Sequence, residues 1–331
     1  MTDFDGKRTS RRGVLRGAAL AAAWPVAGQA QTGTYPNGPI RIIVGFGSGG
    51  LADVTVRLVG EKLAARLGHP VVVENRPGAG GSLAARAAAT AEPSGQTLIV
   101  ISTGNAINAS LFRSLPYDPV RDFTPISALV SFDLLLLAAV GSPLRSVQDV
   151  LAAGRPGGRG LVIATISAGS TQNLAAEWLK NAGGLDATIV TYRSTGEVLT
   201  AVQRGDAQIG FESYAAARGA IDGNLLRPVA STGERRSMLL PDLPTLREAG
   251  LGEYAVTGWN ALFAPAATPA PVVALLNQQI AAILAMPEIR ERLLGLGVEP
   301  APNSPEAMGT LLRQDIATWA RVIDAAGIER Q

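Results

Sequence analysis

The residues best suited to bind a ligand lie in a glycine-rich segment that follows the apolar run Ile40–Val44. The segment reads Gly45-Phe46-Gly47-Ser48-Gly49-Gly50 and leads into a helical pattern. Glycines let the backbone approach a ligand closely, and the first amides of a helix have no partner inside the helix. Such a loop is typical of an anion site. The candidate ligand-binding residues here are Phe46, Gly47, Ser48, Gly49, Gly50 and the acidic Asp53 in the first helical turn.

Polar residues follow three later apolar runs in the same way, where each predicted strand ends. They are Thr103, Gly104 and Asn105 after the run 97–101, Ser167, Ala168, Gly169, Ser170 and Thr171 after the run 161–166, and Glu212 after the run 207–211. Ligands of parallel sheets bind beyond the carboxyl ends of the strands, so we expect these segments to face a common cleft. Each segment alone could instead serve as a helix cap. Glu212 could receive a ligand amine or cap the following turn.

The first glycine segment also matches a dinucleotide-binding fingerprint. Gly45, Gly47 and Gly50 have the G-x-G-x-x-G spacing, and Glu74 could bind the ribose 24 residues later. An exported NAD(P)-dependent oxidoreductase is therefore the alternative hypothesis. The chain has no cysteine, and its single histidine, His69, lies in a predicted turn, so no plausible catalytic histidine or cysteine is available for hydride chemistry.

The composition excludes several other classes of protein. The lack of cysteine excludes disulfides, thiolate zinc sites and cysteine nucleophiles, and the single histidine argues against a zinc or haem site, so we expect no metal site. The formal net charge is +2, of which residues 1–30 carry +3, so the rest of the chain carries −1. That balance argues against nucleic acid as a partner.

Residues 1–30 have the pattern of a signal peptide. A basic stretch with the pair Arg11-Arg12 precedes a small apolar run, Ala18–Ala27, and Gly28-Gln29-Ala30 fits a cleavage site. The arginine pair, between a serine and a leucine, is similar to a twin-arginine signal, and an ordinary Sec signal is the alternative. Both predict a periplasmic protein.

The rest of the chain predicts an α/β fold. Strands are expected at 40–44, 71–73, 97–101, 134–140, 161–164, 188–190, 207–211 and 226–230. Helices are expected at 52–67, 82–89, 170–181 and 195–203, and the capping box Ser146–Asp149 predicts the start of a further short helix. A helical tail follows, with Thr268 as the expected cap of one helix and Ser304 as the cap of the last. Two α/β series plus this tail suggest two lobes.

Several blocks, taken in order, resemble the extracytoplasmic solute receptors of tripartite tricarboxylate transporters, the TctC or Bug family. The blocks are 35–41 (YPNGPIR), 73–81 (VENRPGAGG), 115–119 (LPYDP), 240–250 (LPDLPTLREAG) and 264–270 (APAATPA), with Trp259 before the last of them. Three departures occur in expected pocket segments. Gly47-Ser48 stands where the family usually has two prolines, Asn173-Leu174-Ala175 where it often has His-Leu-Ala, and Tyr192-Arg193-Ser194 where it has Tyr-Lys-Gly.

The resemblance implies a two-lobed periplasmic-binding-protein fold of the type II, Venus-flytrap kind, with the ligand cleft between the lobes. Lobe 1 would comprise residues 31–133 plus 256–331, and lobe 2 residues 134–255. A ligand carboxylate would be held by the loop Phe46–Gly50, and Tyr192 would lie at the pocket rim. The implied function is capture of a small organic acid for membrane transporter subunits or a sensor. We expect the protein to be a monomer that binds no cofactor and has no catalytic activity.

Overall fold

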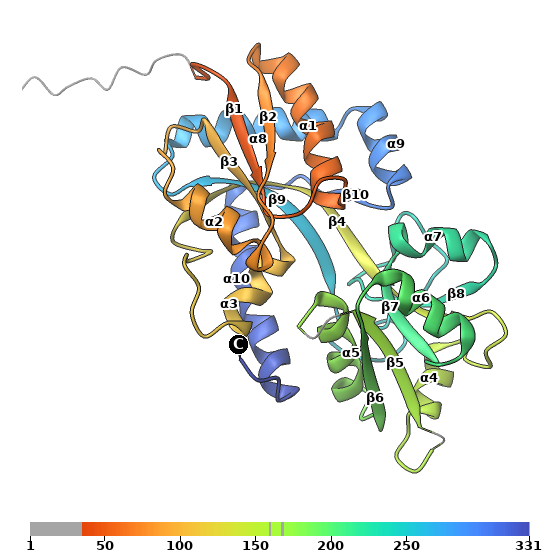
Figure 1. The fold of residues 1–331 in the computed structure, drawn as a ribbon. Coiled ribbons are helices and arrows are strands. Elements are labelled where there is room, and N and C mark those ends of the chain that lie inside the picture. Colours follow the sequence, from red (N-terminus) through yellow and green to blue (C-terminus); the bar gives the residue numbers. More distant parts are fainter. Residues whose placement is uncertain (1–34, 159, 167–168, 331) are drawn as a thin grey trace, which may run out of the picture. The chain divides into compact units, whose positions relative to one another are not determined.

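The computed structural model of the chain describes residues 35–158, 160–166 and 169–330. In this part, ten strands form two sheets that share one long strand, β4 (Phe123–Ala139) (Figure 1). The expected signal peptide and the candidate residues Ser167 and Ala168 lie outside the described residues.

The first sheet combines parallel and antiparallel strands. It contains the first half of β4 together with β1 (Ile40–Val44), β2 (Val71–Asn75), β3 (Thr97–Ser102), β9 (Thr257–Pro265) and β10 (Glu299–Pro300). β1 pairs in parallel with β2 and β3, whereas β9 is antiparallel to both β3 and β4. The helices in the same parts of the chain are α1 (Leu51–Leu67), α2 (Ser82–Ala89), α3 (Thr103–Leu111), α8 (Ala270–Leu284), α9 (Pro287–Gly295) and α10 (Pro305–Ala325).

The second sheet lies between residues 134 and 231. It contains the second half of β4 together with β5 (Leu161–Ile166), β6 (Ala187–Tyr192), β7 (Ile209–Ser213) and β8 (Leu226–Ser231). β5 is parallel to β6 and β7, and β4 pairs antiparallel with β7 and β8. Its helices are α4 (Val147–Ala153), α5 (Thr171–Ala182), α6 (Thr195–Arg204) and α7 (Tyr214–Asp222).

β4 leaves the first sheet and enters the second between two consecutive residues. Asp133 pairs with Thr257 of β9, and Leu134 pairs with Ser213 of β7. The buried Thr232 holds this crossing in place. Its hydroxyl accepts a hydrogen bond from the Leu134 amide (2.9 Å) and donates one to the Val256 carbonyl (2.6 Å). The Thr232 amide donates to Leu134 O, and the Thr232 carbonyl accepts from the Val256 amide. One residue therefore connects β4 to the segment that enters β9.

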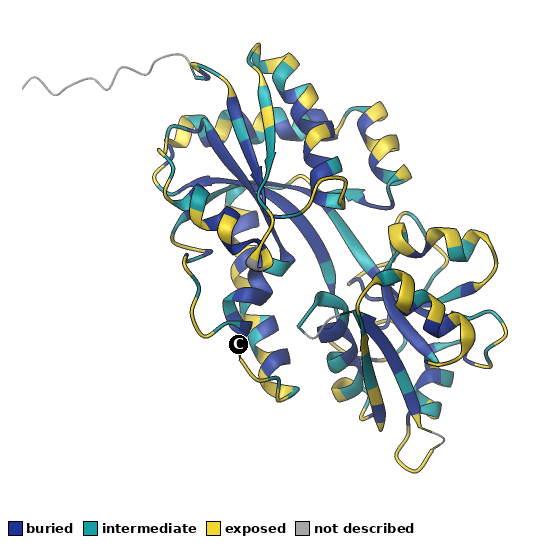
Figure 2. Ribbon diagram, viewed as in Figure 1, coloured by how far each residue is buried: buried dark blue, intermediate teal, exposed yellow. Residues whose placement is uncertain are grey.

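Apolar periodicity accounts for most of the elements, because the apolar faces of strands and helices are the buried ones (Figure 2). Leu276, Ile280 and Ile283 of α8, spaced three to four residues apart, form a buried stripe. The capping box at α4 is confirmed, since Ser146 Oγ accepts from the Asp149 amide and Asp149 accepts from the Ser146 amide. Among the described residues no single helix is long and apolar enough to cross a membrane. Helices α8 and α9 reach that length and hydrophobicity only when taken together, and they are bent by 74° relative to each other.

Several sequence expectations need correction. β4 begins at Phe123 rather than at 134, because its first half pairs with β9 and has too many polar residues to show as an apolar run. Residues 103–105 lie in the first turn of α3 and not in a loop. α8 begins at Ala270, and Thr268 donates its hydroxyl to Pro265 O instead of capping the helix. The elements α7, α9, β9 and β10 had no predicted counterpart.

The Thr232 contacts predict a specific loss of stability. Replacing Thr232 with the isosteric valine leaves the Leu134 amide and the Val256 carbonyl without the hydroxyl partner. We expect the free energy of unfolding to fall by about 2–4 kcal/mol. Thr232→Ser keeps the hydroxyl and is the control. Urea unfolding of the three proteins measures the effect, and equal stability of the valine and serine variants would contradict it.

Candidate functional site

Four helices begin at the edge of one cavity of about 310 Å³. They are α1, α3, α5 and α7, each of which is the next helix after a strand of one of the two sheets. The lining residues are Phe46, Gly50, Leu51, Ala52, Ser102, Thr103, Gly104, Phe132, Leu134, Thr171, Gln172, Ser213, Trp259 and Asn260. The first two helices follow strands of the first sheet and the last two follow strands of the second, so both sheets build the cavity.

Among the residues that the structure describes, none that lines this cavity carries a charged side chain. Its polarity comes from hydroxyls, amides and helix N-termini. The first amides of each helix lack an intrahelical partner, and the helix dipole places partial positive charge at that end. Converging helix N-termini favour an anion, and a carboxylate is the size that a cavity of 310 Å³ accepts together with a short body.

The N-terminus of α1 is the least capped of the four. Its N-cap residue is Gly50, and no side chain caps it. The preceding Gly49 has φ of +79°, a conformation that favours glycine. Gly47 and Ser48 complete the turn between Phe46 and Gly49, but they do not line the cavity. This arrangement leaves backbone amides, rather than a side chain, to meet a ligand.

Asp53 holds this loop in position. Its carboxylate accepts hydrogen bonds from the Gly49 amide (2.9 Å), Arg57 Nε (2.9 Å) and Asn75 Nδ2 (2.9 Å), and Asn75 also donates to Phe46 O. Burial acts to raise the pKa of Asp53, but these hydrogen bonds outweigh it and the pKa is lowered. The Asp53 side chain is therefore an ionised support of the loop and does not line the cavity.

The start of α3 provides both lining and support. Thr103 and Gly104 line the cavity, and Thr103 Oγ1 accepts a hydrogen bond from the Trp259 amide (2.9 Å). Asn105 is buried and does not line it. The Asn105 side chain accepts from Ser102 N and Oγ and donates to Tyr117 Oη (3.0 Å), so it fixes the helix start.

On the opposite side, α5 is capped by its own residues. Ser170 Oγ accepts from the Asn173 amide and donates to Ile166 O, and the Gly169 amide donates to Asn173 Oδ1. Thr171 and the following Gln172 line the cavity. Ser170 is therefore engaged as a helix cap. Of the predicted ligand-binding residues 169–171, Thr171 lines the cavity, and Gly169 and Ser170 do not.

Glu212 lies directly behind the lining. It is 1% exposed and accepts hydrogen bonds from Thr195 Oγ1 (2.8 Å), Gln172 Nε2 (3.4 Å) and the Ser213 amide (3.3 Å). Burial raises the pKa of Glu212, and the hydrogen bonds act against that rise. Tyr192 ends β6, half-buried, and does not line the cavity.

The sequence did not single out the part of the wall formed by β4 and β9. Phe132 and Leu134 flank the point where β4 crosses, and Trp259 comes from β9. Only tertiary pairing places these residues beside α1 and α3. Leu51, Ala52, Ser102, Gln172 and Ser213 are immediate neighbours of predicted residues, so their positions next to the strand ends were an available signal.

Trp259 is fixed at both of its N–H groups. Besides the amide bond to Thr103, its indole Nε1 donates to Asp315 Oδ2 of α10 (2.6 Å). Burial raises the pKa of Asp315 from its ordinary 3.8 to about 6, and the indole bond opposes the rise. Asp315 therefore orients an aromatic wall of the cavity without touching the cavity itself.

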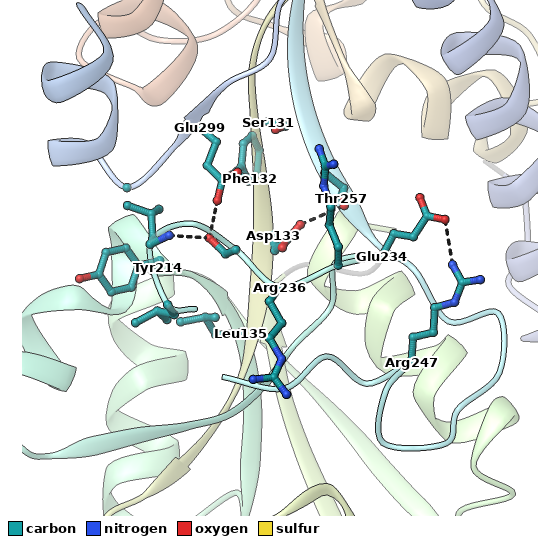
Figure 3. Close-up of a pocket in the computed structure, with 15 residues that line it drawn as sticks. Ser131, Phe132, Asp133, Leu135, Tyr214, Glu234, Arg236, Arg247, Thr257 and Glu299 are labelled. Atoms are coloured by element: carbon teal, nitrogen blue, oxygen red, sulfur yellow. Dashed lines mark hydrogen bonds and ion pairs between the residues drawn. The ribbon is translucent and has the colours of Figure 1, made fainter. Parts of the chain in front are cut away.

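A larger cavity, about 680 Å³, lies beside the crossing of β4 (Figure 3). Most of its charged groups are partnered within the protein. Arg236 pairs with Glu248, Arg247 pairs with Glu234, and Glu299 accepts from Ser237 Oγ and the Met238 amide. Asp133, whose pKa burial raises to about 6, accepts from Thr257 Oγ1. These contacts engage most of the charged side chains that line this cavity, Arg235 excepted.

The dinucleotide alternative is not supported. Glu74, the expected ribose-binding acid, pairs with Arg76 (2.6 Å) and Arg41 (3.6 Å). The strand order β2-β1-β3-β9-β4 also places an antiparallel strand next to β3, which the dinucleotide fold does not have at that position.

Two sheets that share a crossing strand and surround a cavity with helix N-termini provide a binding site suited to a small anionic solute. The model of the tripartite tricarboxylate transporter family receptor matches residues 55–328. The chain therefore belongs to this family of solute-binding receptors.

Known proteins are similar to this one in sequence and structure over nearly the whole chain. A UPF0065 protein of Bordetella bronchiseptica is 32% identical over 96% of this chain and 94% of its own. BugT of Bordetella pertussis is 30% identical over 91% and 93%. Among solved structures, R. palustris Rpa4515 with adipate is 31% identical, with a TM-score of 0.74, and the match covers 89% of this chain and 99% of that one. MatC from Rhodopseudomonas palustris with bound malate is 32% identical, with a TM-score of 0.70, and the match covers 87% of this chain and 100% of that one. The periplasmic binding protein BugD is 28% identical, with a TM-score of 0.71, and the match covers 90% of this chain and 100% of that one.

The raised pKa of Asp315 predicts how stability changes with pH. Since the folded protein favours the neutral acid, the stabilising contribution is present below pH 3.8 and is lost as the pH rises through about 6. Asp315→Asn is neutral throughout and can still accept from Trp259. We therefore expect the free energy of unfolding of the wild-type protein to fall, between pH 3.8 and about 6, by on the order of 1–2 kcal/mol more than that of the variant. Thermal unfolding at several pH values measures this, and parallel curves for the two proteins would contradict it.

Proposed function

We propose that this receptor captures a small organic carboxylate in the cavity formed by the starts of α1, α3, α5 and α7. The observation that carries the proposal is the convergence of four helix N-termini on a cavity whose described lining residues are all uncharged. Backbone amides and hydroxyls there would replace the hydration of a carboxylate, at roughly 1.5–3 kcal/mol for each charge-assisted hydrogen bond. The adipate and malate bound by two similar proteins support the same class of ligand.

The proposed ligand contacts combine the sequence candidates with the lining. Phe46 and Gly50 of the first loop and the residues Thr103, Gly104 and Thr171 would touch the ligand, whereas Asp53, Asn105, Ser170 and Glu212 would hold these segments in position. The lobes would comprise residues 31–133 plus 256–331 and residues 134–255, and the change of sheet at Asp133 and Leu134 supports that division. The protein would act by binding, without catalysis, as a monomer that delivers the acid to transporter subunits or to a sensor.

Gly104 provides a charge test of the carboxylate site. Its φ is not in the left-handed region, and a Cβ there would have only Ser102 Oγ, at 3.4 Å, as a near neighbour. Gly104→Asp places a carboxylate at the cavity wall, and Gly104→Asn places a neutral group of the same size there. We expect the aspartate variant to lose about tenfold or more in carboxylate affinity relative to the asparagine variant.

Isothermal titration with a panel of carboxylic acids measures the difference, after thermal-shift screening has found those that bind. Thermal unfolding without ligand checks that both variants fold. Equal affinities of the two variants would place the anion elsewhere, and a panel in which no acid stabilises the wild-type protein would contradict the proposed function.

Export to the periplasm is the second part of the proposal, with the twin-arginine route read from Arg11 and Arg12. Arg11→Lys together with Arg12→Lys keeps the charge but removes both guanidinium groups. We expect the doubly substituted precursor to stay unprocessed in the cytoplasm. Cell fractionation and the size of the protein measure this, and normal processing would indicate a Sec signal.

A further inference from the structure

The two ends of the carboxylate cavity differ in charge, and this inference rests on the proposed function. At the α1 end the nearby acid, Asp53, is neutralised by Arg57, with 2.9 Å between the ion-pair atoms. The N-terminus of α1 has no side-chain cap. Asp53 occupies the Gly49 amide, so the amides that follow it at the start of α1 can receive a ligand carboxylate.

The end formed by α5 and α7 is different. The serines before these helices cap them, since Ser170 accepts from the Asn173 amide and Ser213 from the Ala216 amide. Glu212 lies just behind, and the three groups that donate to it, from Thr195, Gln172 and Ser213, are all uncharged. In the described part of the chain no basic side chain lies within 4 Å of it. A second ligand carboxylate at this end would face a buried carboxyl that has no cation partner, so binding it would mean like-charge repulsion or the uptake of a proton by Glu212.

The wall between the two ends is apolar. Phe46, Leu51, Phe132, Leu134 and Trp259 supply it. An apolar cavity of roughly 150 Å³ holds a benzene molecule, so a cavity of 310 Å³ has room for a substituted ring or a short alkyl chain with polar ends. Hydroxyl groups of a ligand that face these five side chains would lose their hydration without gaining partners.

We propose that the ligand is a monocarboxylate with an apolar body whose far end is an uncharged hydrogen-bonding group, such as a primary amide or a hydroxyl. Its carboxylate binds at the N-termini of α1 and α3. Its far end lies against Gln172 and Ser213, where Glu212 selects against a second carboxylate. Glu212 is thus a specificity-determining residue that acts through its neighbours and does not touch the ligand.

Matched pairs of acids test this preference. Adipate and its monoamide share one skeleton, as do terephthalate and its monoamide, and each pair differs only in whether the far end is a carboxylate or an amide. We expect the wild-type protein to bind the monoamide on the order of tenfold more tightly than the diacid by isothermal titration calorimetry, and Glu212→Gln to remove most of that difference.

Glu197→Gln is the matched control, because it makes the same change of charge at an exposed position on α6. It should keep the wild-type preference. If wild type binds the diacids as tightly as the monoamides, the inference is wrong whatever the stability of the Glu212 variant. An unchanged preference in a folded Glu212→Gln protein would overturn the role of Glu212. Failure of all four acids and of the wider carboxylate panel to bind would instead overturn the proposed function.

Discussion

The crossing of β4 from one sheet to the other is the constraint on which the site depends. Asp133 and Leu134 are consecutive residues, yet they pair with strands of different sheets. The carboxyl ends of β1 and β3 in the first sheet therefore share a cavity with those of β5 and β7 in the second. Thr232 stabilises this geometry with hydrogen bonds to both β4 and the segment entering β9, and it is completely buried. Without the crossing, the helix N-termini of the two sheets would not share a cavity.

The cavity achieves its polarity without charged side chains among its described lining residues. Helix N-termini and hydroxyls are fixed dipoles, so they carry a smaller desolvation cost than buried arginines would. The charged cavity beside the crossing shows the opposite design, because its arginines and acids are mostly partnered with one another or with nearby polar groups. A set of charges that satisfy each other stabilises the segment 232–247 but leaves little to attract a solute.

The first glycine loop illustrates how a local departure from the family pattern is compensated. Gly47 and Ser48 stand where the family usually has prolines, which predicts a less rigid loop. In the structure, Asp53 holds the Gly49 amide and Asn75 holds the Phe46 carbonyl, while Arg57 bonds both Asp53 and Asn75. Side-chain hydrogen bonds from α1 and β2 thus support the backbone where ring constraints are missing.

The sequence by itself determined the α/β alternation, most strand and helix positions and the glycine and hydroxyl segments at the strand ends, because these depend on local periodicity and capping. It also predicted that segments such as Phe46–Gly50, 103–105 and 169–171 meet. Whether most of these side chains face the cavity or support it was decided by tertiary structure. Asp53 and Asn105 are engaged by Asn75 and Tyr117, which lie further along the sequence, whereas Ser170 is engaged by a local cap to the Asn173 amide. Phe132 and Trp259 line the cavity because β4 crosses between sheets and β9 pairs beside it, and such long-range pairing leaves no mark in local sequence.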